Sequence, residues 1–115
     1  MRRDWRLRQR EDFQRLRQQG QVYRLPLLHL SIAPNEITFN RYGFIVSKQI
    51  GNAVTRNLVR RRLREIVRQL HPHLKPGFDM VFIARSGIAE QPFDVLQRTV
   101  NDLTRRARLL QEGIP

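Results

Sequence analysis

The stretch FDMVFIAR, residues 78–85, constrains the fold more than any other part of this 115-residue sequence. It is apolar almost throughout and has the length of a β-strand. A strand that faced water on one side would alternate apolar and polar residues, whereas a near-continuous run is typical of a strand with both faces covered. The rest of the chain must therefore supply packing elements for both faces of a sheet.

Helical periodicity in three segments supplies candidates for that cover. Residues 10–20, REDFQRLRQQG, carry acidic residues where a helix begins and Gly20 where it can end. Residues 53–70 place their apolar side chains on one stripe, with Asn52 as a cap before them and HPHLKPG as a stop after them. A last helix begins near Pro92 and repeats apolar residues at helical spacing.

Strand periodicity fills the region between the first two helices. In LLHLSIA, residues 27–33, leucine and isoleucine alternate with His29 and Ser31, as in a half-buried strand. The turn PNE follows, and ITFNRYGFIVS after it predicts one short strand and one longer strand with alternation over 42–47. The order is αβββαβα, which predicts an α+β two-layer sandwich with a mixed four-stranded sheet packed against helices.

The length of the chain suits one domain over residues 1–115. The sequence contains no internal repeat, low-complexity segment or interdomain linker. Only the first few residues and the closing EGIP are expected to fray.

Charge limits the partners of such a domain. Lys and Arg total 22 against 10 Asp and Glu, a formal net charge of +12. This excess attracts polyanions, so nucleic acid and acidic membrane surfaces are the leading classes of partner. No apolar run approaches the roughly 20 residues of a membrane span, the start MRRDWRLRQR lacks the apolar core of a signal peptide, and cysteine is absent. We therefore expect a soluble, cytoplasmic protein without disulfides.

The helix at 53–70 concentrates this charge. Four arginines fall on a stripe beside the apolar one: Arg60, Arg61, Arg64 and Arg68. Arg56 lies near the start of the helix, Arg62 lies on the other flank, and Glu65 is the only acid in the segment. Gly51 permits a close approach before the helix, where free amides add to the positive end of the helix dipole. Like charges four residues apart repel one another, and solvated helix faces usually mix both signs. The pattern therefore favours contact with the phosphate backbone of a nucleic acid.

Catalysis by the chain itself is not indicated. A protein nuclease needs clustered carboxylates for metal ions or a histidine pair for acid and base work, and the acids here are scattered. Asp12 is better explained as a residue of a helix N-terminus. His71 and His73 lack a nearby third metal ligand. We therefore assign no catalytic or metal-binding residue. Two functions without catalysis stay open for the chain: a basic RNA-binding protein, such as a ribosomal protein, and a DNA-binding protein.

The segment SKQIGNAVTRNLVRRRLRE resembles the signature of the bacterial ribonuclease P protein subunit, which is a Lys, then Gly-x-Ala-Val-x-Arg-Asn, then spaced basic positions. The matching residues are Lys48, Gly51, Ala53, Val54, Arg56, Asn57, Arg61 and Arg64. REDFQRLRQQG resembles the first helix of this family and DMVFIAR resembles its strand that ends in a basic residue. The sequence departs from the pattern at Leu58, where a second Arg is usual, at Arg17, where an aromatic is frequent, and at Gln49, where a second Lys is common.

The resemblance implies a protein cofactor of an RNA-based enzyme. In this family the catalytic subunit is RNA, and the enzyme removes the 5′ leader from precursor tRNA by metal-dependent phosphodiester hydrolysis. The implied partners are the ribonuclease P RNA and precursor tRNA, with no obligate protein partner, and magnesium ions would be held mainly by the RNA. The family also implies a left-handed βαβ crossover around the basic helix, against the usual right-handed connection.

The resemblance divides the candidate residues between two RNA surfaces. The basic helix would hold the catalytic RNA through its backbone, with Arg56, Asn57, Arg60, Arg61, Arg64 and Arg68. A cleft between the first helix and the sheet would hold the single-stranded leader by stacking and charge, with Phe13, Arg17, Tyr42, Phe44, Lys48 and Arg85. Arg17 would stack as a cation, and Arg60 to Arg62 would compensate for Leu58. Burial in a core is the competing interpretation for Phe13 and Phe44.

Overall fold

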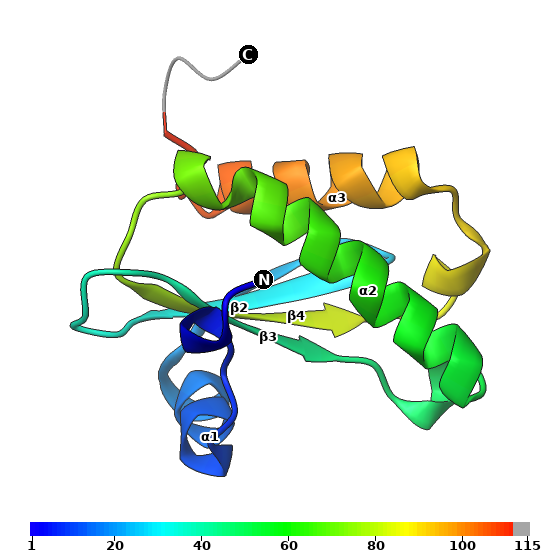
Figure 1. Cartoon of the computed structure of the whole chain (residues 1–115), viewed down its shortest axis with the longest axis horizontal. Coiled ribbons are helices and arrows are strands. Elements are labelled where there is room, and N and C mark those ends of the chain that lie inside the picture. The colour runs from blue at the N-terminus through cyan, green and yellow to red at the C-terminus, as the bar shows by residue number, and fades with distance from the viewer. Residues whose placement is uncertain (112–115) are drawn as a thin grey trace.

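The structure, a computed structural model, describes residues 1–111 and contains a four-stranded sheet with helices on both of its faces (Figure 1). The helices are α1 (Arg10–Gln19), α2 (Ala53–Leu70) and α3 (Phe93–Arg106), and the strands are β1 (Gln21–Arg24), β2 (Leu28–Pro34), β3 (Arg41–Ile45) and β4 (Phe78–Ala84). The predicted order αβββαβα is therefore confirmed. The predicted frayed end EGIP lies outside the described residues.

The strands are arranged in the order β1-β2-β4-β3. Strand β2 is antiparallel to β1 and β4, whereas β3 runs parallel to β4, with Ile45 opposite Ile83. The sheet is thus mixed, as predicted. The connection from β3 through α2 to β4 is left-handed, as the resemblance implied, although parallel strands are almost always joined by right-handed connections (Figure 1).

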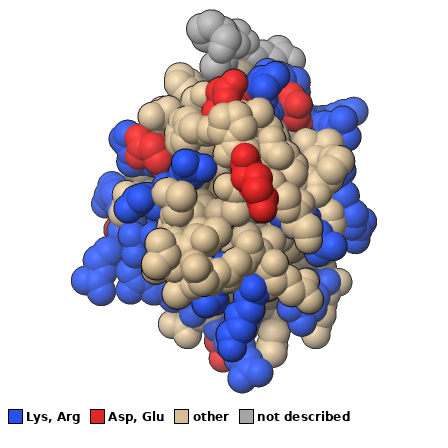
Figure 2. Space-filling view, turned by 90° about the vertical axis from the view of Figure 1, so that its right-hand side faces the viewer, with Lys and Arg blue, Asp and Glu red and all other residues tan. Residues whose placement is uncertain are grey.

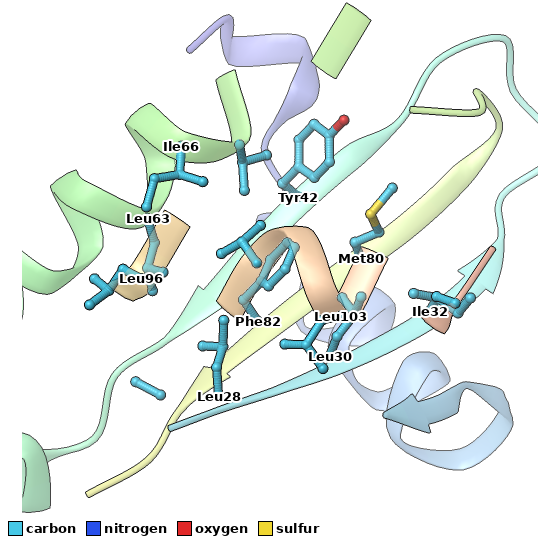
Figure 3. Packing of buried hydrophobic residues seen from close by; sticks show 14 of the residues in the cluster. Leu28, Leu30, Ile32, Tyr42, Leu63, Ile66, Met80, Phe82, Leu96 and Leu103 are labelled. Carbon is cyan, nitrogen blue, oxygen red and sulfur yellow. The ribbon is translucent and has the colours of Figure 1, made fainter. Parts of the chain in front are cut away.

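The main core lies between the sheet and the pair α2 and α3. Figure 3 shows Leu63 and Ile66 of α2 and Leu96 of α3 turned toward Phe82 of β4, and all four side chains are almost fully buried. Strand β4 is buried along most of its length, which confirms that its apolar run is covered on both faces. The apolar stripes of α2 and α3 thus supply the cover on one side.

The second face of the sheet is covered only in part. Helix α1 lies across it, and its buried Leu16 joins a small cluster with Leu7, Ala33 and Val81 (Figure 1). No side chain of α2 or α3 belongs to this cluster among the described residues. Helix α1 is therefore attached over a much smaller apolar area than the other two helices.

Two strand positions differ from the prediction. The short strand predicted within ITFN is a turn, since the Ile37 amide donates to Asn35 Oδ1 at 2.9 Å, Asn35 Nδ2 donates to the Phe39 carbonyl at 3.0 Å, and Glu36 has a left-handed φ of 63°. The strand β1 was not predicted. Three of its four residues are exposed at the edge of the sheet, so no alternation of apolar and polar residues marks it.

The N-terminal segment, whose first residues we expected to fray, lies along the free edge of β3. The Leu7 amide donates to the Tyr42 carbonyl at 2.8 Å, and Arg6 forms a parallel bridge with Tyr42 along the free edge of β3. The Trp5 ring stacks on His71 with 3.6 Å between ring centroids. The segment thus covers an edge strand that would otherwise expose unpaired backbone groups.

Candidate nucleic-acid interface

Helix α2 starts at a cap that fixes its orientation. Asn52 Oδ1 accepts a hydrogen bond from the Thr55 amide at 2.9 Å, as predicted for this cap. A Cβ atom on Gly51 would lie 2.9 Å from Thr55 Cγ2, so the chain enters the helix through a contact that a larger residue would disturb. Because Val59 and Leu63 are buried in the core, the arginine stripe must lie outside it.

One flank of α2, which we call the basic face, consists of the exposed Asn57 and Arg61 and the half-buried Arg56, Arg60 and Arg64. Arg60 is held in place because its Nη1 donates to Asn57 Oδ1 at 2.9 Å and its Nη2 donates to the Val46 carbonyl at 3.4 Å. Burial, together with the charges of Arg6 and Arg60, lowers the pKa of Arg64. Three guanidinium groups therefore lie near one another, and an anion placed among them would relieve their repulsion.

Other predicted residues of α2 are placed less favourably for an anion. Arg68 pairs with Glu65 through two hydrogen bonds of 2.7 and 3.0 Å, so its charge is already compensated. Arg62 lies on the other flank and donates to the Gln91 carbonyl at 3.4 Å. Of Arg60 to Arg62, which we expected to compensate for Leu58, only Arg61 is exposed, whereas Arg60 and Arg62 are half-buried.

A groove of about 260 Å³ opens between α1 and the sheet. Its floor contains Ile45 of β3 and Val81 and Ile83 of β4, and Phe13 and Arg17 of α1 form one side. A Cβ atom on Gly43 would lie 2.8 Å from Phe13 Cε1, so glycine lets the aromatic ring approach the strand closely. The ring remains half-buried and lines the groove.

The other side of the groove is cationic. Arg24 and His29 line it, and the exposed Arg85 follows the end of β4, where its amide donates to the Leu27 carbonyl at 3.0 Å. Burial lowers the pKa of His29, and the charges of Arg85 and Arg24 lower it further, so these two guanidinium groups lie near the ring. The groove therefore combines an apolar floor and an aromatic ring with positive charges, which suits a single nucleic-acid strand.

Comparison with known proteins identifies the family. The family model for ribonuclease P matches residues 1–108. The chain belongs to the ribonuclease P protein family. A ribonuclease P protein component of Roseiflexus castenholzii is 48% identical over 115 residues, which cover 99% of this chain and 94% of that protein. The component from Chloroflexus aurantiacus is 47% identical and covers 96% of this chain and 82% of that protein.

Solved structures of ribonuclease P proteins have the same fold. The Staphylococcus aureus protein is 28% identical with a TM-score of 0.87, covering 93% of this chain and 98% of that one. The Thermotoga maritima protein, in complex with 1-(4-fluorophenyl)-2-thiourea, is 28% identical with a TM-score of 0.82, covering 87% of this chain and 97% of that one. The predicted fold class is thereby confirmed.

Family membership decides the class of function. Ribonuclease P proteins are the protein subunits of an RNA-based endoribonuclease in tRNA processing and work with the ribonuclease P RNA. The chain is accordingly such a subunit, as the resemblance implied. The ribosomal and DNA-binding alternatives are set aside.

Two residues predicted for the leader cleft of this ribonuclease P protein lie on the wrong face of the sheet. Tyr42 is only 1% exposed and belongs to the main core; burial raises its pKa to about 12, and its hydroxyl shares a 2.8 Å hydrogen bond with His71 Nδ1. Phe44 packs on the same core and stacks on Phe82 with 5.8 Å between ring centroids. Side chains alternate along β3, so Gly43 and Ile45 face the groove and Tyr42 and Phe44 cannot.

Of the four remaining leader candidates, two line the groove. Phe13 and Arg17 line it, whereas Lys48 and Arg85 are exposed just beyond the ends of β3 and β4. Figure 2 views the molecule from the end toward which these strands run, and Lys and Arg side chains lie along the flanks and lower edge of that view.

Sequence reasoning missed Arg24 and His29 as groove residues. Arg24 belongs to the strand that was not predicted. His29 did carry a signal, because its alternation with leucines placed it with Ser31 on the face away from the main core.

Within residues 1–111 no group of three His, Asp or Glu side chains is placed to hold a metal ion. His71 instead packs between Trp5 and Tyr42. In the same part of the chain, every helix is too short or too polar to cross a bilayer.

Proposed function

We propose that this subunit binds the ribonuclease P RNA through the basic face of α2 and holds the 5′ leader of precursor tRNA in the groove beside α1. It would thereby promote endonucleolytic removal of the leader. The observation that carries the proposal is the placement of the two surfaces on different helices, since α2 covers one face of the sheet and the groove lies on the other (Figure 1). One subunit can then contact two RNAs at once.

The basic face suits structured RNA because it offers positive charge to the phosphate backbone rather than contacts to individual bases. Arg61 and Asn57 are exposed, Arg60 and Arg64 are half-buried, and Arg60 is held by hydrogen bonds to Asn57 and to the Val46 carbonyl. Guanidinium groups bind phosphate oxygens in pairs of hydrogen bonds, and such contacts position a duplex independently of its sequence. We assign Arg68 a smaller part than predicted, because Glu65 already binds its guanidinium group.

The groove suits a single strand because stacking needs bases that are not paired. The Phe13 ring offers an aromatic face, and the exposed Arg17 offers a cation that can stack on a base. Arg24 and Arg85 on the other side can hold the phosphates that connect successive bases. Lys48, at the end of β3, extends the same charge toward α2.

The chemistry of cleavage is assigned to the RNA. Phosphodiester hydrolysis would rest on magnesium ions, which activate water and stabilise the leaving oxygen. We propose that these ions are held mainly by the RNA, and the scattered carboxylates of the described residues support that assignment. We also propose a cytoplasmic location, where bacterial tRNA is made and processed.

Reconstitution tests the proposal. Cleavage of precursor tRNA is measured at low magnesium concentration with a bacterial ribonuclease P RNA, with and without this protein, and with the protein alone. We expect stimulation only when RNA and protein are both present. Failure to stimulate would contradict the cofactor role, and cleavage by the protein alone would contradict the assignment of catalysis to RNA.

A further inference from the structure

Asp79 lies at the centre of an ion cluster outside the groove and the basic face. Its side chain is fully buried at 0% exposure. Oδ1 accepts hydrogen bonds from Asn35 Nδ2 at 3.0 Å and from Arg41 Nε at 2.9 Å, and Oδ2 accepts from Arg41 Nη2 at 2.7 Å and from Arg15 Nη2. These hydrogen bonds use all the lone-pair directions of the carboxylate.

The donors to Asp79 come from parts of the chain that are distant in sequence. Arg41 belongs to β3, Asn35 follows β2, and Arg15 belongs to α1. Arg15 also donates from Nη1 to the Pro34 carbonyl at 3.2 Å, at the end of β2. Hydrogen bonding to Asp79 raises the pKa of Arg41, which is the expected effect of a buried anion beside a cation.

Helix α1 is attached to this cluster at two points. Arg15 binds Asp79 directly, and Asp12 accepts a hydrogen bond from Arg41 Nη2 at 3.4 Å. Asp12 and Arg15 are three residues apart, so they lie on the same side of the helix. Phe13 and Arg17, which line the groove, occur between and just beyond these two anchors.

The apolar contacts of α1 cannot fix it in the same way. Its buried cluster contains four residues in all, and a larger apolar contact with the sheet would fill the space that the groove occupies. Hydrogen-bonded charges along one side of a helix can fix its position while leaving the other side open. Hydrogen-bonded charge pairs are also directional, whereas the hydrophobic effect is not.

We propose that Asp79 is a positioning residue for the leader groove, acting through Arg15 and Arg41 to hold α1 where Phe13 and Arg17 face a single RNA strand. The proposal rests on the function proposed above. Loss of the contact between Asp79 and Arg15 would let α1 shift relative to the groove floor. Such a shift would misplace Phe13 and Arg17 relative to the bases on which they are proposed to stack.

The test uses Arg15→Gln, because Arg15 is 29% exposed and the Asp79–Arg41 pair remains in this variant. Arg15→Lys keeps the charge and serves as the conservative variant. Val100→Ala, in the core on the other face, is the matched control that lowers stability without touching the cluster. The holoenzyme with each protein is titrated with precursor tRNA that carries a leader and with the same tRNA lacking it.

We expect Arg15→Gln to lower the ratio of the two affinities by about tenfold, the loss of roughly one stacked base, and Arg15→Lys to restore part of it. Val100→Ala should leave the ratio unchanged. Hydrogen exchange of the free protein should be faster in α1 of Arg15→Gln and unchanged in α2.

Three results would overturn the proposal: an unchanged ratio in Arg15→Gln, an equal fall in Val100→Ala, or unchanged exchange in α1. The wild-type holoenzyme tests the proposed function separately. If it binds both tRNAs equally, the assignment of the groove to the leader is wrong, whatever the rate of hydrogen exchange in α1.

Discussion

The two faces of the sheet are covered by different means. On one face, α2 and α3 bury a continuous apolar core that includes Phe82 and Leu103. On the other face, α1 buries little apolar area and is attached through the ions around Asp79, and a groove stays open beside it. A protein of this size needs one well-packed core for stability, which leaves the second face available for binding.

The largest expected effect tests the claim that stability resides on the α2 and α3 face. Phe82→Ala should lower the free energy of unfolding by about 4 kcal/mol, because it removes a fully buried ring and leaves a cavity. Leu16→Ala on the α1 face should cost about 2 kcal/mol, since that cluster is small and can relax into the open groove. Denaturant unfolding measures both. A larger loss in Leu16→Ala would contradict the comparison.

The next effect concerns the charge on the α2 side. Affinity for the ribonuclease P RNA should fall steeply with salt, and Arg61→Ala should reduce the slope of log affinity against log salt by about 1. Arg98→Ala in α3 is the control, because Arg98 is exposed but lies away from the basic face and near Asp94. Equal changes in both variants would show that binding depends on net charge alone.

Histidine pKa values predict how stability responds to pH on each face. Burial lowers the pKa of His71 on the main core side and of His29 in the groove, so the unfolded chain binds protons more readily. The free energy of unfolding should therefore fall as the pH drops below about 6.5. His29→Val should reduce this dependence, as measured by denaturant unfolding at pH 7 and pH 5. A free energy of unfolding that rises as the pH falls would contradict this prediction.

The smallest effect sharpens the description of the basic face. Glu65→Gln should leave the melting temperature unchanged, since the pair with Arg68 is exposed to solvent. It should raise affinity for the ribonuclease P RNA by less than about threefold, because Arg68 becomes available to phosphate. Filter binding at moderate salt would detect this change. A fall in affinity would mean that the pair itself contributes to the RNA surface.

The elements with long periodic sequences were predicted correctly. Helix α2 and strand β4 were predicted because 18 and seven residues, respectively, keep one pattern almost throughout. The strand β1 was not predicted because an exposed edge strand needs no alternation of apolar and polar residues. The false strand in ITFN arose because the Asn35 side chain closes a turn among residues that otherwise favour strands.

The candidate site was predicted only where local pattern decides which way a side chain points. Phe13 and Arg17 lie four residues apart on one helix and reach the same groove. Tyr42 and Phe44 were assigned to the groove although their alternation along β3 places them on the main core. The Asp79 cluster depends on the register of β3 against β4 and on the position of α1, which no local pattern specifies.

The separation of two RNA surfaces is the central claim, and a crossed binding experiment tests it most directly. Phe13→Ala and Arg61→Ala are each measured for affinity to the ribonuclease P RNA and, as holoenzyme, to precursor tRNA with its leader. The account predicts that Phe13→Ala weakens only the binding of leader-bearing tRNA and that Arg61→Ala weakens only the binding of the catalytic RNA. Equal losses for both RNAs in both variants would contradict it.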